Sequence, residues 1–189
     1  MDYIEDQTFE HKDYLEMPLK LADYEHCIFK NCNFSTVDLS RIKFISCAFI
    51  ECNLSNVTLH ETSFQDVKFN NCKMLGLQLE HCNKFGLSFE FSGCALSHSS
   101  FYELKIKKTR FINTQLEEVD FSSSDLTEVV FDNCNLLRAV FDRTNLERAD
   151  FSTAHNYSID PEINKIKQAI FSHDGIIGLL DKYDIDIRK

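Results

Sequence analysis

The chain has 189 residues, enough for one domain, and contains only 5 glycines and 2 prolines beside 17 phenylalanines. So few turn residues argue against an ordinary mixed fold and favour a regular, periodic one. The formal net charge of −10 argues against direct binding of nucleic acid, because phosphate contacts require a basic surface.

The N-terminal residues include acids where a secretory signal has a basic segment followed by an apolar one. No apolar run approaches the roughly 20 residues that a membrane-spanning helix needs. We therefore expect a soluble, cytoplasmic protein with no membrane partner.

The dominant feature of the chain is a five-residue period. Every fifth residue is apolar from Phe9 to Leu79, at fifteen of fifteen positions, and again in a shifted phase from Phe91 to Phe151, at thirteen of thirteen positions. Neither the two-residue period of a strand nor the helical period of about 3.6 residues produces this spacing. We call these apolar residues the centres of the repeats.

The eight cysteines share one register, because each lies two positions before a centre or before the position where a centre is due. A free cysteine behaves as a small buried hydrophobe, so we expect an inner structural ladder. Disulfides or metal ligation would not explain the register, and a cytosolic chain disfavours disulfides. The predicted ladder consists of Cys27, Cys32, Cys47, Cys52, Cys72, Cys82, Cys94 and Cys134.

This pattern resembles the pentapeptide-repeat family, whose consensus is a small residue, Asp or Asn, then Leu or Phe, then two polar residues. The match covers about residues 7 to 153, in segments such as Cys32-Asn33-Phe34, Val119-Asp120-Phe121 and Ala149-Asp150-Phe151. The resemblance implies an all-β fold for residues 1–155, a right-handed quadrilateral β-helix with one pentapeptide per face. About 29 pentapeptides would then form about seven coils, roughly 34 Å tall at about 4.8 Å per coil.

With four faces per coil, residues twenty apart in the sequence share a face. The centres of the second run alternate between Phe and Leu apart from Ile106, so we expect Phe to stack on Phe and Leu on Leu. The same spacing places charges in cross-coil columns, where pairing contributes little stability per pair. Two such columns are Lys108, Glu128, Arg148 and His98, Glu118, Arg138.

The register breaks once, between Cys82 and Cys94, where two residues are inserted. We expect a bulge or short loop at Lys84, Phe85, Gly86, Leu87, Ser88, Phe89 and Glu90. The Qnr-type members of the family carry longer projecting loops that matter for function. Two interpretations stay open, a tolerated bulge and a recognition loop.

The repeat ends after Phe151, and we expect residues 156–189 to form a helical cap and dimerisation tail. Asp160 and Pro161 are typical of a helix start, Ser172 of a cap for a helix over 173–183, and Ile185 and Ile187 of a short strand. This ending resembles the Qnr-type and McbG-type proteins, whose tails pair two solenoids end to end. The predicted homodimer interface is Ile176, Ile177, Leu179, Leu180, Tyr183, Ile185 and Ile187; alternatively these residues only plug the last coil.

No catalytic motif is recognisable. The seven histidines show no metal-binding spacing, and the chain has no phosphate-binding glycine loop or nucleophile elbow. We expect no enzymatic activity, no cofactor, no metal and no small-molecule substrate.

The charge excess lies on the repeats, with 24 acids and 15 bases up to His155 against six acids and five bases after it. Lys105, Lys107, Lys108 and Arg110 form the one basic cluster. The resemblance to the Qnr-type proteins implies a DNA mimic that binds DNA gyrase or topoisomerase IV and protects against quinolones or gyrase poisons. The alternative is a structural or scaffolding solenoid that binds another protein.

Overall fold

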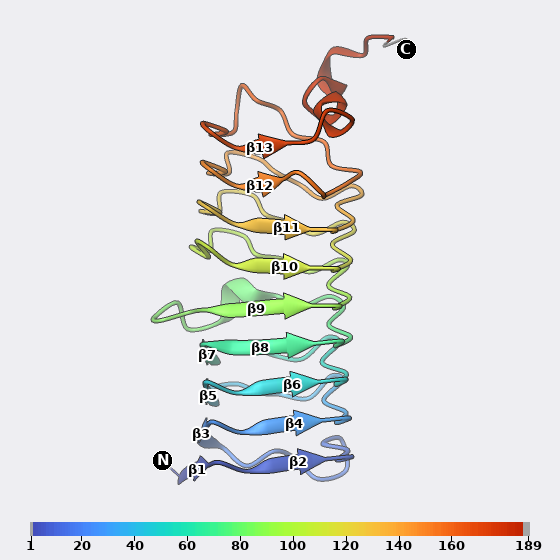
Figure 1. The fold of residues 1–189 in the computed structure, drawn as a ribbon. Coiled ribbons are helices and arrows are strands. Elements are labelled where there is room, and N and C mark those ends of the chain that lie inside the picture. Colours follow the sequence, from blue (N-terminus) through green and yellow to red (C-terminus); the bar gives the residue numbers. More distant parts are fainter. Residues whose placement is uncertain (1, 187–189) are drawn as a thin grey trace.

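A computed structural model describes residues 2–186 (Figure 1). Within this range the fold is an all-β parallel solenoid of about eight turns with almost no helix. The two ends of the chain lie at opposite ends of the stack. No helix in residues 2–186 is long and apolar enough to cross a membrane.

Each turn contributes short strands to parallel ladders. The strands of residues 2–186 are β1 (Asp2–Glu5), β2 (Thr8–Glu10), β3 (Ala22–Glu25), β4 (Ile28–Lys30), β5 (Lys43–Ile45), β6 (Ala48–Ile50), β7 (Ser63–Gln65), β8 (Val67–Asn70), β9 (Phe89–Ser92), β10 (Arg110–Ile112), β11 (Val130–Asp132), β12 (Asp150–Phe151) and β13 (Ile170–Phe171). Three short 3-10 helices complete the described elements: η1 (Leu79–His81), η2 (Gly175–Leu179) and η3 (Asp181–Tyr183).

Four ladders run along the solenoid within residues 2–186. Side 1 is the sheet β1-β3-β5-β7, continued beyond an interruption by bridges through Lys105, Asp125, Asn145 and Lys165. Side 2 is the sheet from β2 to β13. Side 3 consists of bridges such as Asn33↔Asn53, and side 4 of bridges such as Ser100↔Asp120. Partners are twenty residues apart, except across the insertion, where Phe69 pairs with Phe91.

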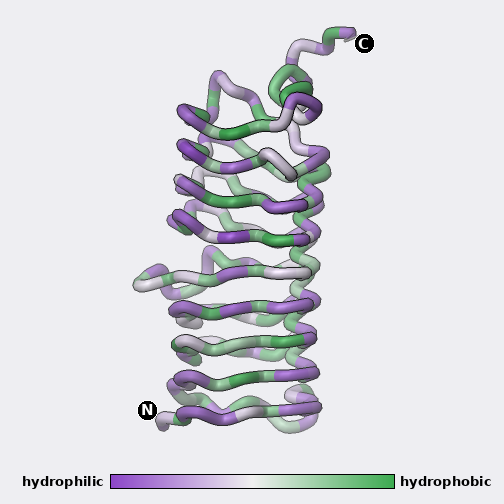
Figure 2. Tube along the Cα trace, in the orientation of Figure 1, coloured by the Kyte–Doolittle hydropathy of each residue, from purple (hydrophilic) through white to green (hydrophobic). Residues whose placement is uncertain are grey.

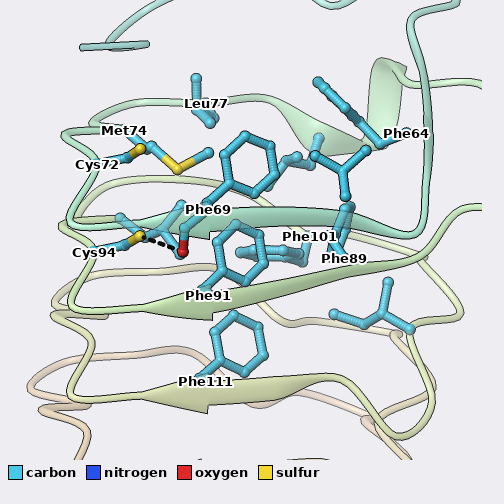
Figure 3. Close-up of a cluster of buried hydrophobic side chains, with 14 of the residues drawn as sticks. Phe64, Phe69, Cys72, Met74, Leu77, Phe89, Phe91, Cys94, Phe101 and Phe111 are labelled. Carbon is cyan, nitrogen blue, oxygen red and sulfur yellow. Dashed lines mark hydrogen bonds between the residues drawn. The ribbon is translucent and has the colours of Figure 1, made fainter. Parts of the chain in front are cut away.

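The centres fill the interior, as the five-residue period predicts. Apolar and polar residues alternate along each coil (Figure 2). On side 2 the rings of Phe69, Phe91 and Phe111 stack with centroids 5.3 and 5.1 Å apart (Figure 3). On side 4 Phe121 stacks between Phe101 and Phe141 at 5.1 and 5.3 Å. The expected stacking of Phe on Phe is therefore confirmed.

The corners of each coil rely on left-handed backbone. In almost every repeat the second residue after the centre has a positive φ, as at Thr36 with φ 60° and Ser123 with φ 58°. Its backbone N–H donates to the adjacent coil, for example Ser123 N to the Asp142 carbonyl at 2.8 Å. This bond offsets the conformational cost of a left-handed residue other than glycine. The Asp or Asn that directly precedes the centre caps the turn. For example, Asp120 Oδ1 accepts a hydrogen bond from Ser122 N at 2.8 Å.

The solenoid extends beyond the predicted end of the repeat at Phe151, because β13 pairs in register with β12 and joins Phe151 to Phe171. The sequence did not reveal this coil, because the polar Asn164 occupies the inner position that usually holds a small or apolar residue. Its Nδ2 donates to the Phe141 carbonyl at 2.9 Å and its Oδ1 accepts from Thr144 N at 2.8 Å. The prediction of about seven coils was therefore low by about one.

The predicted C-terminal helices are also corrected. Asp160 and Pro161 lie in a turn, where Asp160 Oδ1 accepts from Glu162 N at 2.8 Å. The helix expected over 173–183 is instead the pair of short 3-10 helices η2 and η3. Two glycines disfavour a long α-helix here, and short helices are marginal. Ile185 lies in no strand, and Ile187 lies outside the described residues.

Candidate interaction surfaces

All eight cysteines are buried and free. Most donate from Sγ to the carbonyl of a centre in the preceding coil, as Cys94 does to Phe69 at 3.3 Å (Figure 3). Thr144 Oγ1 makes the same bond to Phe121 at 2.9 Å, so a small side chain with a donor can satisfy this carbonyl from the inner position. Burial raises the pKa of Cys47 and Cys134 to about 12. These thiols are therefore poorly suited to nucleophilic or redox chemistry.

The insertion forms a loop, residues 83–88, that projects from side 1 just before β9 (Figure 1). Phe85 is 81% exposed at this loop. Its carbonyl accepts from Gln65 Nε2 at 3.4 Å, and Ser88 N donates to the Phe64 carbonyl at 3.0 Å. The loop is therefore tied to β7 while its aromatic ring faces solvent.

Two residues of the predicted loop belong to the solenoid instead. Phe89 and Glu90 lie in β9, where Phe89 is buried and its ring lies 5.0 Å from that of Phe91. The two extra residues allow the chain to keep Lys84 at the surface and to bury Phe89. Among the predicted loop residues, Lys84, Phe85, Gly86 and Ser88 are exposed and Leu87 is half-buried.

The C-terminal segment, residues 160–186, carries an exposed apolar patch. Of the predicted interface residues, Ile176, Ile177, Tyr183 and Ile185 are each about half exposed. Leu179 packs against the core, and Leu180 is half-buried. Two further isoleucines of this segment, Ile163 and Ile170, are also exposed, and the sequence did not predict them because the predicted repeat ends at Phe151.

A few specific contacts hold this segment on the last coil. Lys182 Nζ lies 2.7 Å from Asp160 Oδ1 and 2.7 Å from Glu162 Oε2. Hydrogen bonding to Lys182 lowers the pKa of both carboxyls. Ile159 N donates to the Gly178 carbonyl at 2.9 Å, and a Cβ at Gly178 would lie only 2.1 Å from the Tyr157 carbonyl oxygen. Glycine is required at this close approach.

A row of acidic residues follows side 4, one for each of six consecutive coils; five present the carboxylate at the surface, and Glu80 is half-buried with Oε2 shielded from solvent. Arg41 and Arg143 are bases on the same side, and Arg143 pairs with Asp142 at 3.0 Å. The coil spacing places these carboxylates at intervals of about 4.8 Å along the solenoid axis. A search for acids at twenty-residue spacing with a tolerance of two or three would have found the row. We call it the acidic row: Asp38, Glu61, Glu80, Glu103, Asp120 and Asp142.

The predicted charge columns pair across coils. Glu128 lies 3.6 Å from Lys108 and 3.0 Å from Arg148, and Glu118 lies 3.0 Å from His98 and 2.7 Å from Arg138. These exposed pairs neutralise parts of sides 1 and 3. Within residues 2–186 no group of three or more His, Cys, Asp or Glu side chains is arranged to hold a metal ion.

These features define a solenoid of five-residue repeats that offers flat charged sides and exposed apolar groups. Residues 22–90 and 87–155 match the family model of the pentapeptide repeat region, so the chain belongs to the pentapeptide-repeat family. No curated protein sequence matches it.

Two solved structures are similar to this chain at low identity. A trypsin-treated variant of QnrB1, described as a plasmid-mediated fluoroquinolone resistance protein, is 13% identical, with 98% of this chain and 100% of that chain covered and a TM-score of 0.59. HetL, a pentapeptide-repeat protein involved in heterocyst differentiation regulation from Nostoc sp. strain PCC 7120, is 14% identical, with 89% and 86% covered and a TM-score of 0.35. At these identities the likeness to QnrB1 shows the fold alone.

Proposed function

We propose that this protein is a non-catalytic binding protein that occupies the DNA-binding groove of a type II topoisomerase, DNA gyrase or topoisomerase IV, and protects it from quinolones or gyrase poisons. The acidic row is the observation that carries the proposal. It supplies a line of carboxylates on a rod, which is the feature that a DNA-binding groove recognises in a phosphate backbone.

The charge density of the acidic row determines how strongly the protein can compete with DNA for a basic groove. Duplex DNA carries one negative charge per about 1.7 Å of axis, whereas the row carries at most one per about 4.8 Å, because Glu80 is half-buried and Asp142 pairs with Arg143. The protein is therefore a weaker ligand than DNA for a basic groove, and it competes through shape as well as charge. Its binding should weaken as salt rises.

End-to-end dimerisation is part of this proposal. The patch of Ile176, Ile177, Tyr183 and Ile185 supports a two-fold contact between C-terminal segments. Two right-handed, four-sided solenoids of about eight turns each would then form a rod of roughly 75 Å or more, at about 4.8 Å per turn.

The dimer is tested by sedimentation of Ile177→Asp, with Ile28→Asp as the control, because Ile28 is an exposed isoleucine on the distant strand β4. At about 500 mM salt, which screens contacts between charged sides, we expect Ile177→Asp to sediment as a monomer and Ile28→Asp as a dimer. Leu179 is unsuitable for this test because it packs on the core. A dimer in both variants would mean that the segment only caps the solenoid.

The topoisomerase contact is tested by a gyrase supercoiling assay with ciprofloxacin. We expect the wild-type protein to protect supercoiling and the variant Glu61→Lys/Glu103→Lys on the acidic row to lose protection. Glu10→Lys/Glu51→Lys changes the net charge equally on side 2, so it should retain protection. An absence of both protection and inhibition at micromolar protein would contradict the proposal.

A scaffolding role toward another protein is the second candidate. The exposed ring of Phe85 on the loop at residues 83–88 favours it, because a protruding aromatic side chain is typical of a protein-binding anchor. It would replace the first candidate if gyrase is unaffected and a protein captured by the wild type is lost with Phe85→Ser.

A further inference from the structure

Side 1 is electrically divided along its length. In its N-terminal half, the outward residues include five acids, Glu5, Asp6, Asp23, Glu25 and Asp66, and one lysine, Lys43. In its C-terminal half they include six bases, Lys105, Lys107, Lys108, Arg148, Lys165 and Lys167, and three acids, Asp125, Glu128 and Glu147. An acidic half and a basic half therefore follow each other on one side of the solenoid.

Contacts within each half do not remove this division. Lys107 pairs with Asp125 at 3.1 Å, and Glu128 is shared by Lys108 and Arg148. Among the ion pairs of residues 2–186, none involves Lys165 or Lys167.

The acidic half retains unneutralised carboxylates in the same way. Asp23 pairs with Lys43 at 3.2 Å, and Glu5 lies 4.0 Å from His26. In the part of the chain that the structure describes, Asp6 and Asp66 are exposed and have no ion pair. Both halves thus present charge that an external partner could neutralise.

The loop at residues 83–88 lies between the two halves and carries Phe85, whose side chain is 81% exposed. The ladder places β1, β3, β5 and β7 before the loop. The bridges through Lys105, Asp125, Asn145 and Lys165 follow it. Side 1 therefore has an aromatic centre and four rungs of opposite charge balance on either side.

We propose that side 1 binds a second copy of this chain, with the two solenoids antiparallel and a two-fold axis near Phe85. The two Phe85 rings then meet at the centre of the contact, and each acidic half faces a basic half. Counted outward from the loop, the fourth rungs bring Lys165 and Lys167 opposite Glu5 and Asp6. An aromatic centre with a charged rim is typical of protein interfaces.

The division of charge on side 1 favours a second copy of the chain over a nucleic acid as the partner. A nucleic acid would gain from Lys165 and Lys167 but would be repelled by Glu5 and Asp6 on the same side. A partner must carry the opposite order of charges to satisfy both halves, and an antiparallel copy carries it by symmetry. This contact uses neither the acidic row on side 4 nor the C-terminal patch, so it is independent of the proposed function.

Two charge-reversal variants, one in each half of side 1, test the contact when they are studied alone and mixed. Lys165→Glu/Lys167→Glu changes the net charge of the residues counted in the C-terminal half from +3 to −1, and Glu5→Lys/Asp6→Lys changes that of the N-terminal half from −4 to 0. Both are built on Ile177→Asp, which removes any end-to-end contact. At about 50 mM salt we expect the Ile177→Asp parent to dimerise, each charge variant alone to associate at least about tenfold more weakly, and their equimolar mixture to form a one-to-one heterodimer in native mass spectrometry.

Two further variants complete the experiment. Lys68→Glu/Lys73→Glu removes the same charge from sides 2 and 3 and should leave association unchanged. Phe85→Ser should weaken it in the parent and in the mixture. A monomeric parent at about 100 µM, a mixture that stays monomeric, or retention of a DNA oligonucleotide that is lost with Lys165→Glu/Lys167→Glu would overturn the proposal.

Discussion

The periodic shaft, residues 22–151, and the C-terminal segment, residues 160–186, are held together in different ways. In the shaft each coil repeats the same contacts, with a buried centre, an inner donor and a left-handed corner residue. In the C-terminal segment, single contacts such as Lys182 with Asp160 and Gly178 with Tyr157 hold the chain. A repeated contact spreads stability over many residues, whereas a single contact concentrates it.

The largest effect is expected from Phe111→Ala in the shaft. Phe111 is fully buried between Phe91 and Phe131, at centroid distances of 5.1 and 5.2 Å. The truncation should reduce the free energy of unfolding by about 3–5 kcal/mol, because it leaves a cavity in the stack. Urea denaturation measures this loss, and Phe85→Ala, which truncates an exposed ring, is the matched control. A loss under about 1 kcal/mol in Phe111→Ala would contradict the account of the shaft.

A smaller effect is expected at a corner of the shaft. Ser123 has φ 58° and its side chain is exposed. Ser123→Val should lower the free energy of unfolding by about 1–2 kcal/mol, because a β-branched residue is strained in this conformation. Ser123→Gly relieves the strain and should be neutral or slightly stabilising. Equal unfolding midpoints for the two variants would show that the corner does not depend on the left-handed conformation.

The smallest effect is expected from acid at the C-terminal segment. Lys182 lowers the pKa of Asp160 and Glu162 from their ordinary values of 3.8 and 4.5. A lowered folded-state pKa means that the stabilisation is present above the ordinary values and is lost as pH falls through the folded-state pKa. Proteolysis of the segment by pepsin should therefore accelerate between pH 4 and pH 2 beyond the change in pepsin activity on an unfolded substrate. Lys182→Met should abolish this extra acceleration, and an unchanged profile would mean that the ion pairs are not formed.

The sequence predicted the shaft well because the same pattern of residue types recurs in each repeat. The inner register of Cys94, the cross-coil pairing of Glu128 with Arg148 and the stacking of Phe69 on Phe91 all follow from the period. The break in register also placed the insertion correctly. It did not reveal that Phe85 projects while Phe89 is buried, because both rings lie near the position where a centre is due.

The sequence did not predict the end of the solenoid or the acidic row, and both failures have a physical reason. Asn164 replaces a small inner residue through two hydrogen bonds that exist only in the folded coil, so the last coil did not look like a repeat. The members of the acidic row occupy different positions within their repeats, as Asp38 and Glu61 do on either side of their centres. They align only when the coils are stacked.

Native-state hydrogen exchange tests the contrast between the two regions most directly. In the shaft, the amides of β10 and β11 should exchange only on global unfolding, because their bonds lie in the middle of a continuous ladder. The amides of residues 175–186 should exchange faster by at least about a hundredfold, because local opening of few contacts frees them. Equal protection in both regions would contradict the account and would make the C-terminal segment part of one cooperative unit with the shaft.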